Sequence, residues 1–360
     1  MKRISSVNGW FRSMPALVIV AGGLLASLPA EAIELFVWRG GSAPVILAGR
    51  DGESGADAMT RYVRAFQQDA DLSRLLNGAS IRMEQTLDPS VGTISKLGDQ
   101  DIETRGLLLA NRVRDLLPGD WRVPTFTKFF DRAGRSSYVL PVAADVGLTE
   151  EEAVEFREEI SNRFALVIAM GGADVDPAMY NETNRFSLDF NGRRDLSEIR
   201  LIQHYTSAKK GFLLGVCRGS QLTSIALGYK MVQDIPKEVG TGVTHADGAF
   251  HDIHLLYTTT GWLSRILGGA KTAYVNSYHH QAVIYRNDGP LQIAARSADG
   301  VTEATESKDG RILLLQFHPE LMDRGTKVDA ALGERIMFGV MKAADYIRTS
   351  TSNAPSKKAM

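Results

Sequence analysis

The residue best suited to chemistry is Cys217, the single cysteine of the 360-residue chain. It lies at the centre of Gly-Val-Cys-Arg-Gly, 215–219, which follows an apolar stretch and precedes a helical one. A strand that turns sharply into a helix presents such a residue at the helix N-terminus, where free N–H groups and the helix dipole favour a thiolate. Glycines two positions to either side avoid collisions in so tight a turn. The pattern favours a nucleophile, and the alternative is a buried thiol in a glycine-rich turn.

A base for this nucleophile is found in Gln-Phe-His-Pro-Glu, 316–320, at the end of another apolar stretch. Histidine can accept and return a proton near neutral pH. Glu320 is two residues away and could orient the imidazole of His318, while Pro319 restricts the backbone between them. The alternative is an isolated histidine at a strand end. We predict a triad of Cys217, His318 and Glu320.

A third pattern, Met-Gly-Gly-Ala-Asp at 170–174, also follows an apolar stretch. Paired glycines allow backbone N–H groups to approach a substrate closely. We expect the N–H groups of Gly172 and Arg218 to form an oxyanion hole, the pair of donors that holds the negative oxygen of a tetrahedral intermediate. An ordinary tight turn is the alternative.

The elements that must position these residues alternate between short apolar strands and helices. Strands are expected at 45–48, 137–142, 164–170, 212–216 and 312–317, and helices at 57–66, 101–117, 195–209, 218–227 and 329–347. Thr149 and Glu152 form a capping box that predicts one more helix start. This alternation predicts an α/β fold, a mostly parallel sheet covered by helices on both faces, with sites at the carboxyl ends of its strands. Residues 51–118 are predicted to form a mostly helical insertion.

The N-terminal segment has the pattern of a secretory signal peptide. The first 14 residues carry three basic residues and no acidic one, an apolar run follows, and the segment 1–32 ends in Ala-Glu-Ala. We therefore expect an exported, periplasmic protein with one domain at 33–348 and a disordered polar tail at 349–360. A membrane tether formed by an uncleaved N-terminus is the alternative. After cleavage no stable membrane insertion is expected, and a formal net charge of −1 predicts no nucleic-acid partner.

Five sequence blocks, including the three described above, together resemble one protein family. They are the elbow helix 215–221, the Gly-Gly-Ala-Asp-Val-Asp-Pro of 171–177, the Asn-Ser-Tyr-His-His-Gln of 276–281, the Asp-Gly-Val-Thr-Glu-Ala of 299–304 and the Gln-Phe-His-Pro-Glu of 316–320. Together they resemble the γ-glutamyl-γ-aminobutyrate hydrolase family from about residue 137 to residue 337. The resemblance implies a class I glutamine amidotransferase-like fold and a triad at Cys217, His318 and Glu320.

The resemblance also suggests residues that contact the substrate. Gln221 would face the glutamyl group, and His279 or His280 would line the same pocket, although a structural loop explains the two histidines equally well. A loose cluster of His245, His251 and His254 is expected to be structural, so neither a metal nor a cofactor is predicted.

The expected activity is hydrolysis of γ-glutamyl amides through a thioester, with a small γ-glutamyl compound as the partner. A glutaminase-type amidotransferase subunit and a non-catalytic exported binding protein are the alternatives. The chain departs from the family pattern at Met170, where proline is usual, and in the insertion 51–118.

Overall fold

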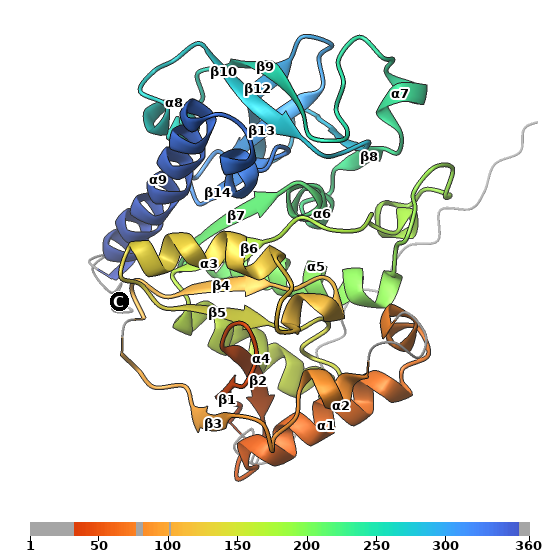
Figure 1. Ribbon diagram of the computed structural model, residues 1–360, viewed down its shortest axis with the longest axis vertical. Coiled ribbons are helices and arrows are strands. Elements are labelled where there is room, and N and C mark those ends of the chain that lie inside the picture. Colours follow the sequence, from red (N-terminus) through yellow and green to blue (C-terminus); the bar gives the residue numbers. More distant parts are fainter. Residues whose placement is uncertain (1–31, 77–81, 101, 353–360) are drawn as a thin grey trace, which may run out of the picture. The chain divides into compact units, whose positions relative to one another are not determined.

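The computed structural model describes residues 32–76, 82–100 and 102–352, whose secondary structure is shown in Figure 1. The strands are β1 (Glu34–Arg39), β2 (Val45–Gly49), β3 (Thr93–Lys96), β4 (Gly106–Leu109), β5 (Ser137–Leu140), β6 (Leu166–Ala169), β7 (Phe212–Val216), β8 (Lys230–Val232), β9 (Ala249–Leu255), β10 (Thr272–Ser277), β11 (Ala282–Ile284), β12 (Leu291–Ser297), β13 (Thr302–Ser307) and β14 (Ile312–Leu315). The helices are α1 (Gly55–Gln68), α2 (Met83–Thr86), α3 (Arg122–Arg132), α4 (Glu150–Arg163), α5 (Gly192–Ala208), α6 (Arg218–Ala226), α7 (Ile235–Glu238), α8 (Trp262–Ile266) and α9 (Lys327–Ser352).

A 12-stranded sheet organises these elements in the order β10-β9-β12-β13-β14-β7-β6-β4-β5-β2-β1-β3. The central strands from β14 to β2 pair in parallel, and antiparallel strands extend both edges. Because successive side chains of a strand point to opposite faces, each central strand contributes to two cores. In β6, Leu166 and Ile168 join one apolar cluster, while Val167 and Ala169 join the other.

Helices cover both clusters, which confirms the predicted α/β fold. Helices α1, α3 and α9 bury apolar residues in the first cluster, and α4, α5 and α6 bury theirs in the second. Helix α4 begins at the predicted capping box, in which Thr149 accepts from the N–H of Glu152 and the Glu152 carboxylate accepts from the N–H of Thr149. Parallel strands covered on both faces place their carboxyl ends at one edge of the sheet, where Cys217 and His318 lie.

The predicted helix at 101–117 is wrong. Residues 106–109 form β4, which pairs in parallel with β5 and β6 in the centre of the sheet. A short continuous apolar run does not distinguish a helix from a strand that is buried on both faces, and Leu107 to Leu109 are such a run. Within residues 51–118, the main helix is α1, which confirms the helix predicted at 57–66. The same segment also contains β3 and β4, which belong to the sheet.

The predictions for the two ends of the chain can be compared with the structure only in part. Helix α9 continues to Ser352, so the beginning of the tail expected at 349–360 is helical, and residues 353–360 lie outside the described part. The expected signal peptide, 1–32, also lies outside it except for its last residue. Among the helices that the structure describes, none has both the length and the apolarity of a transmembrane span.

Candidate active site

The turn between β7 and α6 holds Cys217 in a conformation that few residues other than glycine adopt. Its φ is 52° and its ψ is −112°, and the side chain is buried. The flanking glycines are required sterically, because a Cβ on Gly219 would lie 1.9 Å from the carbonyl oxygen of Ala169. A strained backbone of this kind persists only where the surrounding structure enforces it. The predicted elbow is thus present and presents the thiol at the N-terminus of α6.

The register between two neighbouring strands brings His318 next to Cys217. Strand β14 pairs in parallel with β7, with Leu315 opposite Val216, so that Cys217 and His318 follow adjacent strand ends. The Nδ1 of His318 lies 2.7 Å from Oε1 of Glu320, and both side chains are buried. Asn276 fixes the histidine backbone, since it accepts from the N–H of His318 and donates to its carbonyl oxygen, both at 2.9 Å. The structure therefore brings Cys217, His318 and Glu320 together.

The surroundings of His318 favour its protonated form. Burial alone would lower the pKa of its imidazole, but the charges of Glu320 and Cys217 and hydrogen bonds to both outweigh burial and raise the pKa well above its ordinary value. An imidazolium that stays charged above neutral pH can stabilise a neighbouring thiolate and later supply a proton. This is the electrostatic arrangement that a cysteine nucleophile requires.

A Glu320→Gln variant should change the pH dependence of any Cys217-dependent reaction. Removing the negative charge of Glu320 lowers the pKa of His318, so the proton is lost at lower pH. We expect the alkaline limb of the kcat/KM profile to move to lower pH and the rate at neutral pH to fall. Steady-state kinetics across pH on wild type and variant check this, and an unmoved alkaline limb would contradict it.

Both predicted oxyanion donors lie beside the cysteine. Gly171 and Gly172 line a cavity together with Cys217 and His318, and a Cβ on Gly171 would lie 2.7 Å from Cε1 of His318. Arg218 is the first residue of α6, so its N–H has no partner within the helix. Asn111 donates to the carbonyl oxygen of Gly171 at 2.6 Å and so holds the glycine turn.

The side chain of Arg218 points away from the cavity into a buried ionic network. Its guanidinium contacts Asp195 at 2.7 Å and Glu198 at 2.8 Å, and none of the three side chains is more than 7% exposed. This network ties α5 to the first turn of α6 and holds the backbone N–H of Arg218 in place.

Removing the Arg218 side chain should therefore be costly. Arg218→Ala leaves Glu198 buried without its cation and Asp195 with Arg194 alone, and we expect a loss of about 3–5 kcal/mol in the free energy of unfolding. The exposed Arg200, which pairs with Glu150, is the matched control, for which Arg200→Ala should cost less than about 1 kcal/mol. Urea denaturation measures both, and equal losses would contradict the assignment.

The cavity beside Cys217 contains residues that the sequence did not single out. It is lined by Arg112, Trp121, Arg122, Thr125, Phe126, Met170, Gly171, Gly172, Cys217, Tyr278, His318, Glu320, Leu321 and Arg324. The guanidinium of Arg324 lies 4.4 Å from the ring centroid of Trp121, and that of Arg122 lies 5.0 Å from it. Three arginines give the cavity a positive lining that suits an anionic ligand. Of the three arginines, only Arg112 follows the carboxyl end of a central strand, β4, where functional residues are expected. The sequence did not reveal this position, because residues 101–117 were predicted to be a helix.

The three residues expected to contact the substrate lie elsewhere. The amide nitrogen of Gln221 donates to the carbonyl oxygen of Gln281 and to the side chain of Gln316 within the core. His279 is buried and its Nδ1 contacts the Gln281 carbonyl oxygen, while His280 pairs with Asp174 and Asp234. Among the described residues, those that line the Cys217 cavity include none of the three, so their positions favour structural roles.

Fold and site together define the class: a class I glutamine amidotransferase-like α/β protein. A model of the peptidase C26 family matches residues 123–320, and the chain belongs to this family. It is 35% identical over 176 residues to protein NtpR of Enterococcus hirae, a match that covers 46% of this chain and 71% of that protein. It is 30% identical over 201 residues to the glutamine amidotransferase-like protein YvdE of Lactococcus lactis, covering 54% and 79%.

Similarity to solved structures is weaker. A glutamine amidotransferase from Thermotoga maritima has 15% sequence identity and a TM-score of 0.44, with 70% of this chain and 99% of that one covered. The family match thus supports the broader superfamily, and the resemblance to γ-glutamyl-γ-aminobutyrate hydrolases remains an expectation.

Proposed function

We propose that this protein hydrolyses γ-glutamyl amide bonds with Cys217 as the nucleophile. The observation that carries the proposal is the strained, buried Cys217 beside a His318 whose pKa is raised by Glu320 and by the cysteine itself. Membership of the peptidase C26 family and similarity to a glutamine amidotransferase-like protein support amide chemistry.

The reaction follows from these positions. The Cys217 thiolate attacks the amide carbonyl carbon, and the resulting oxyanion accepts hydrogen bonds from the backbone N–H groups of Gly172 and Arg218. The C–N bond breaks as His318 gives its proton to the leaving amine. Water then attacks the thioester while His318 takes a proton from it, and the γ-glutamyl group leaves as a carboxylate with the thiolate restored.

The arginine-lined cavity points to substrates that carry carboxylates. Arg122 is already paired with Asp115 and Asp120, at 3.6 and 3.3 Å. Arg324 instead lies over Trp121 at the cavity wall. A guanidinium placed in this way can bind a carboxylate on the amine half of the substrate, beyond the bond that is cleaved.

Arg324→Gln should therefore discriminate between substrates. For γ-glutamyl amides of amino acids we expect KM to rise about 10- to 100-fold, the worth of a charge-assisted hydrogen bond. For γ-glutamyl amides of neutral amines KM should change little. The matched control is Arg335→Gln on α9. Steady-state kinetics with both substrate classes measure this, and an equal change for both would rule out a carboxylate contact.

The activity itself is tested by screening the full chain against a panel of γ-glutamyl amides and free glutamine, with Cys217→Ala as the control. Release of glutamate from the amides supports the proposal. Turnover of glutamine alone would favour a glutaminase-type amidotransferase subunit. No turnover and no iodoacetamide labelling of Cys217 at neutral pH would favour a binding protein.

A further inference from the structure

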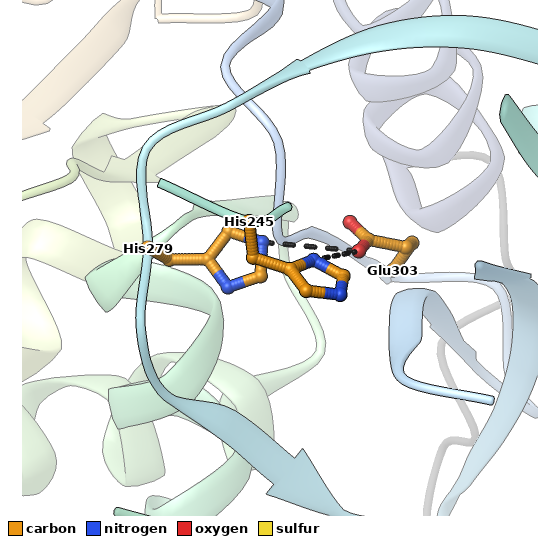
Figure 2. Close-up of side chains that lie close together, drawn as sticks. All are labelled: His245, His279 and Glu303. Atoms are coloured by element: carbon orange, nitrogen blue, oxygen red, sulfur yellow. Dashed lines mark ion pairs between the residues drawn. The ribbon is translucent and has the colours of Figure 1, made fainter. Parts of the chain in front are cut away.

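A second buried cluster of polar side chains lies outside the catalytic cavity. His245 precedes β9, His279 follows β10 and Glu303 is in β13 (Figure 2). The Nδ1 of His245 lies 3.2 Å from Oε1 of Glu303, and the Nε2 of His279 lies 3.8 Å from the same oxygen. The three side chains are 2%, 2% and 0% exposed. Segments far apart in the sequence thus direct three ligand-type atoms to one buried point.

The hydrogen bonds of His279 determine which of its nitrogens carries the proton. Its Nδ1 lies 3.0 Å from the carbonyl oxygen of Gln281, which can only accept, so Nδ1 is the donor. Its Nε2 therefore presents a lone pair to the Glu303 carboxylate, and it has no hydrogen-bond partner.

His245 is held in the same way: one ring nitrogen donates to an acceptor, and the other ring nitrogen faces Glu303. Its Nε2 lies 2.9 Å from Oδ2 of Asp299, which fixes the donor at Nε2. Its Nδ1 is buried and makes no aligned hydrogen bond, although it lies 3.2 Å from Glu303. Histidines that bind metals commonly donate their second N–H to a carboxylate or a carbonyl oxygen in this manner. The Nδ1 of His245 and the Nε2 of His279 therefore converge on the Glu303 carboxylate, whose Oε1 accepts a hydrogen bond from the Nε2 of His251.

We propose that His245 Nδ1, His279 Nε2 and Glu303 bind a Zn²⁺ ion. At zinc–ligand distances of about 2.0–2.1 Å, tetrahedral ligand atoms lie about 3.3 Å apart, and the two separations of 3.2 and 3.8 Å are close to this. Nitrogen and oxygen donors of this kind suit zinc. The Nε2 of His251 donates to the same Glu303 oxygen at 3.2 Å and so orients the carboxylate, and a water molecule would complete the coordination.

The site is structural rather than catalytic. None of the three ligands lines the Cys217 cavity. The ion joins β13 to the segments that precede β9 and follow β10, and these elements support the histidine of the triad. The N–H of Gln316 donates to the Glu303 carbonyl oxygen at 2.8 Å, and Asn276 in β10 clamps His318. Zinc would therefore stiffen the framework of His318 without contacting substrate.

The alternative occupant is a proton. Burial opposes protonation of His245, but its close contacts with the Glu303 and Asp299 carboxylates outweigh burial and raise the pKa of this histidine. Glu303 shows the same balance, since burial would raise its pKa but the surrounding histidines lower it to about 2. A protonated His245 would neutralise the cluster without any metal, and metal analysis separates the two cases.

The experiment uses the full chain with Cys217→Ala, so that the thiolate cannot bind zinc and the result does not depend on the proposed hydrolysis. After incubation with zinc and removal of the excess, elemental analysis should find about one zinc per chain. His279→Gln and Glu303→Gln should each lower the retained zinc at least tenfold. The control is His254→Gln, an exposed histidine of β9 that lies outside the cluster, and it should retain the metal.

A second measurement protects the test against variants that do not fold. Zinc at about 100 times its dissociation constant should raise the Tm of the metal-free Cys217→Ala chain by about 5 °C, and Co²⁺ should give tetrahedral visible absorption bands. Absence of both effects, or equal zinc in the His279→Gln variant, would overturn the proposal and leave a proton-balanced polar core.

Discussion

Cys217→Ala is expected to abolish turnover, and His318→Ala is expected to lower kcat by about 10⁴-fold or more. The reason is that the thiolate and the imidazolium act as one unit, so that loss of either removes covalent catalysis. Glu320→Ala should cost less, because the two hydrogen bonds between Asn276 and the backbone of His318 remain. Initial rates on the best γ-glutamyl amide from the panel measure all three variants.

Two controls are needed to attribute a loss of rate to the active site. Circular dichroism and thermal unfolding must show that each variant is folded. His204→Ala removes a histidine that pairs with Glu158 on α4, and it should leave the rate unchanged. Activity at the wild-type level in the Cys217→Ala protein would refute the proposed mechanism as a whole.

Gly172→Ala should have the second largest effect, a fall in kcat of about 10²–10³-fold. A Cβ at this position would lie 1.9 Å from Oδ1 of Asn111, the residue that holds the neighbouring Gly171 carbonyl oxygen. The turn must shift, and its N–H then leaves the place where an oxyanion develops. Losing one such donor typically costs this much in rate.

The matched control is Gly242→Ala, a glycine with open space around its Cβ position. It should leave both kcat and KM unchanged. If Gly172→Ala retains kcat within a few fold of wild type while its fold is intact, the oxyanion donors lie elsewhere in the cavity.

Local sequence signals were sufficient to predict the elbow and to place Cys217, His318 and Glu320 at one edge of the sheet. The glycines around Cys217 and the His-Pro-Glu of 318–320 each follow a strand, and strand ends of a parallel sheet meet at one edge. Contacts between distant segments could not be foreseen in the same way. The clamp of Asn276 on His318 and the position of Arg324 over Trp121 depend on tertiary structure.

The errors have physical causes as well. The run Leu107–Leu109 fits a helix or a strand, and only its place between β5 and β6 decides between them. Gln221 lies one helical turn after Cys217, which suggested that it faces the substrate. Every residue of α6 is buried, however, so its side chain faces the protein core instead.

The assembly of the triad from β7 and β14 has a consequence for the newly made chain. Ribosomes synthesise Cys217 well before His318, 101 residues earlier (318 − 217), and the imidazolium that favours the thiolate is absent until β14 has paired with β7. Until then neither His318 nor Glu320 lies beside Cys217, so the proposed hydrolysis has no proton donor or acceptor. Under the proposed mechanism, activity therefore requires that β14 has joined the sheet, and a chain that ends before β14 would be inactive.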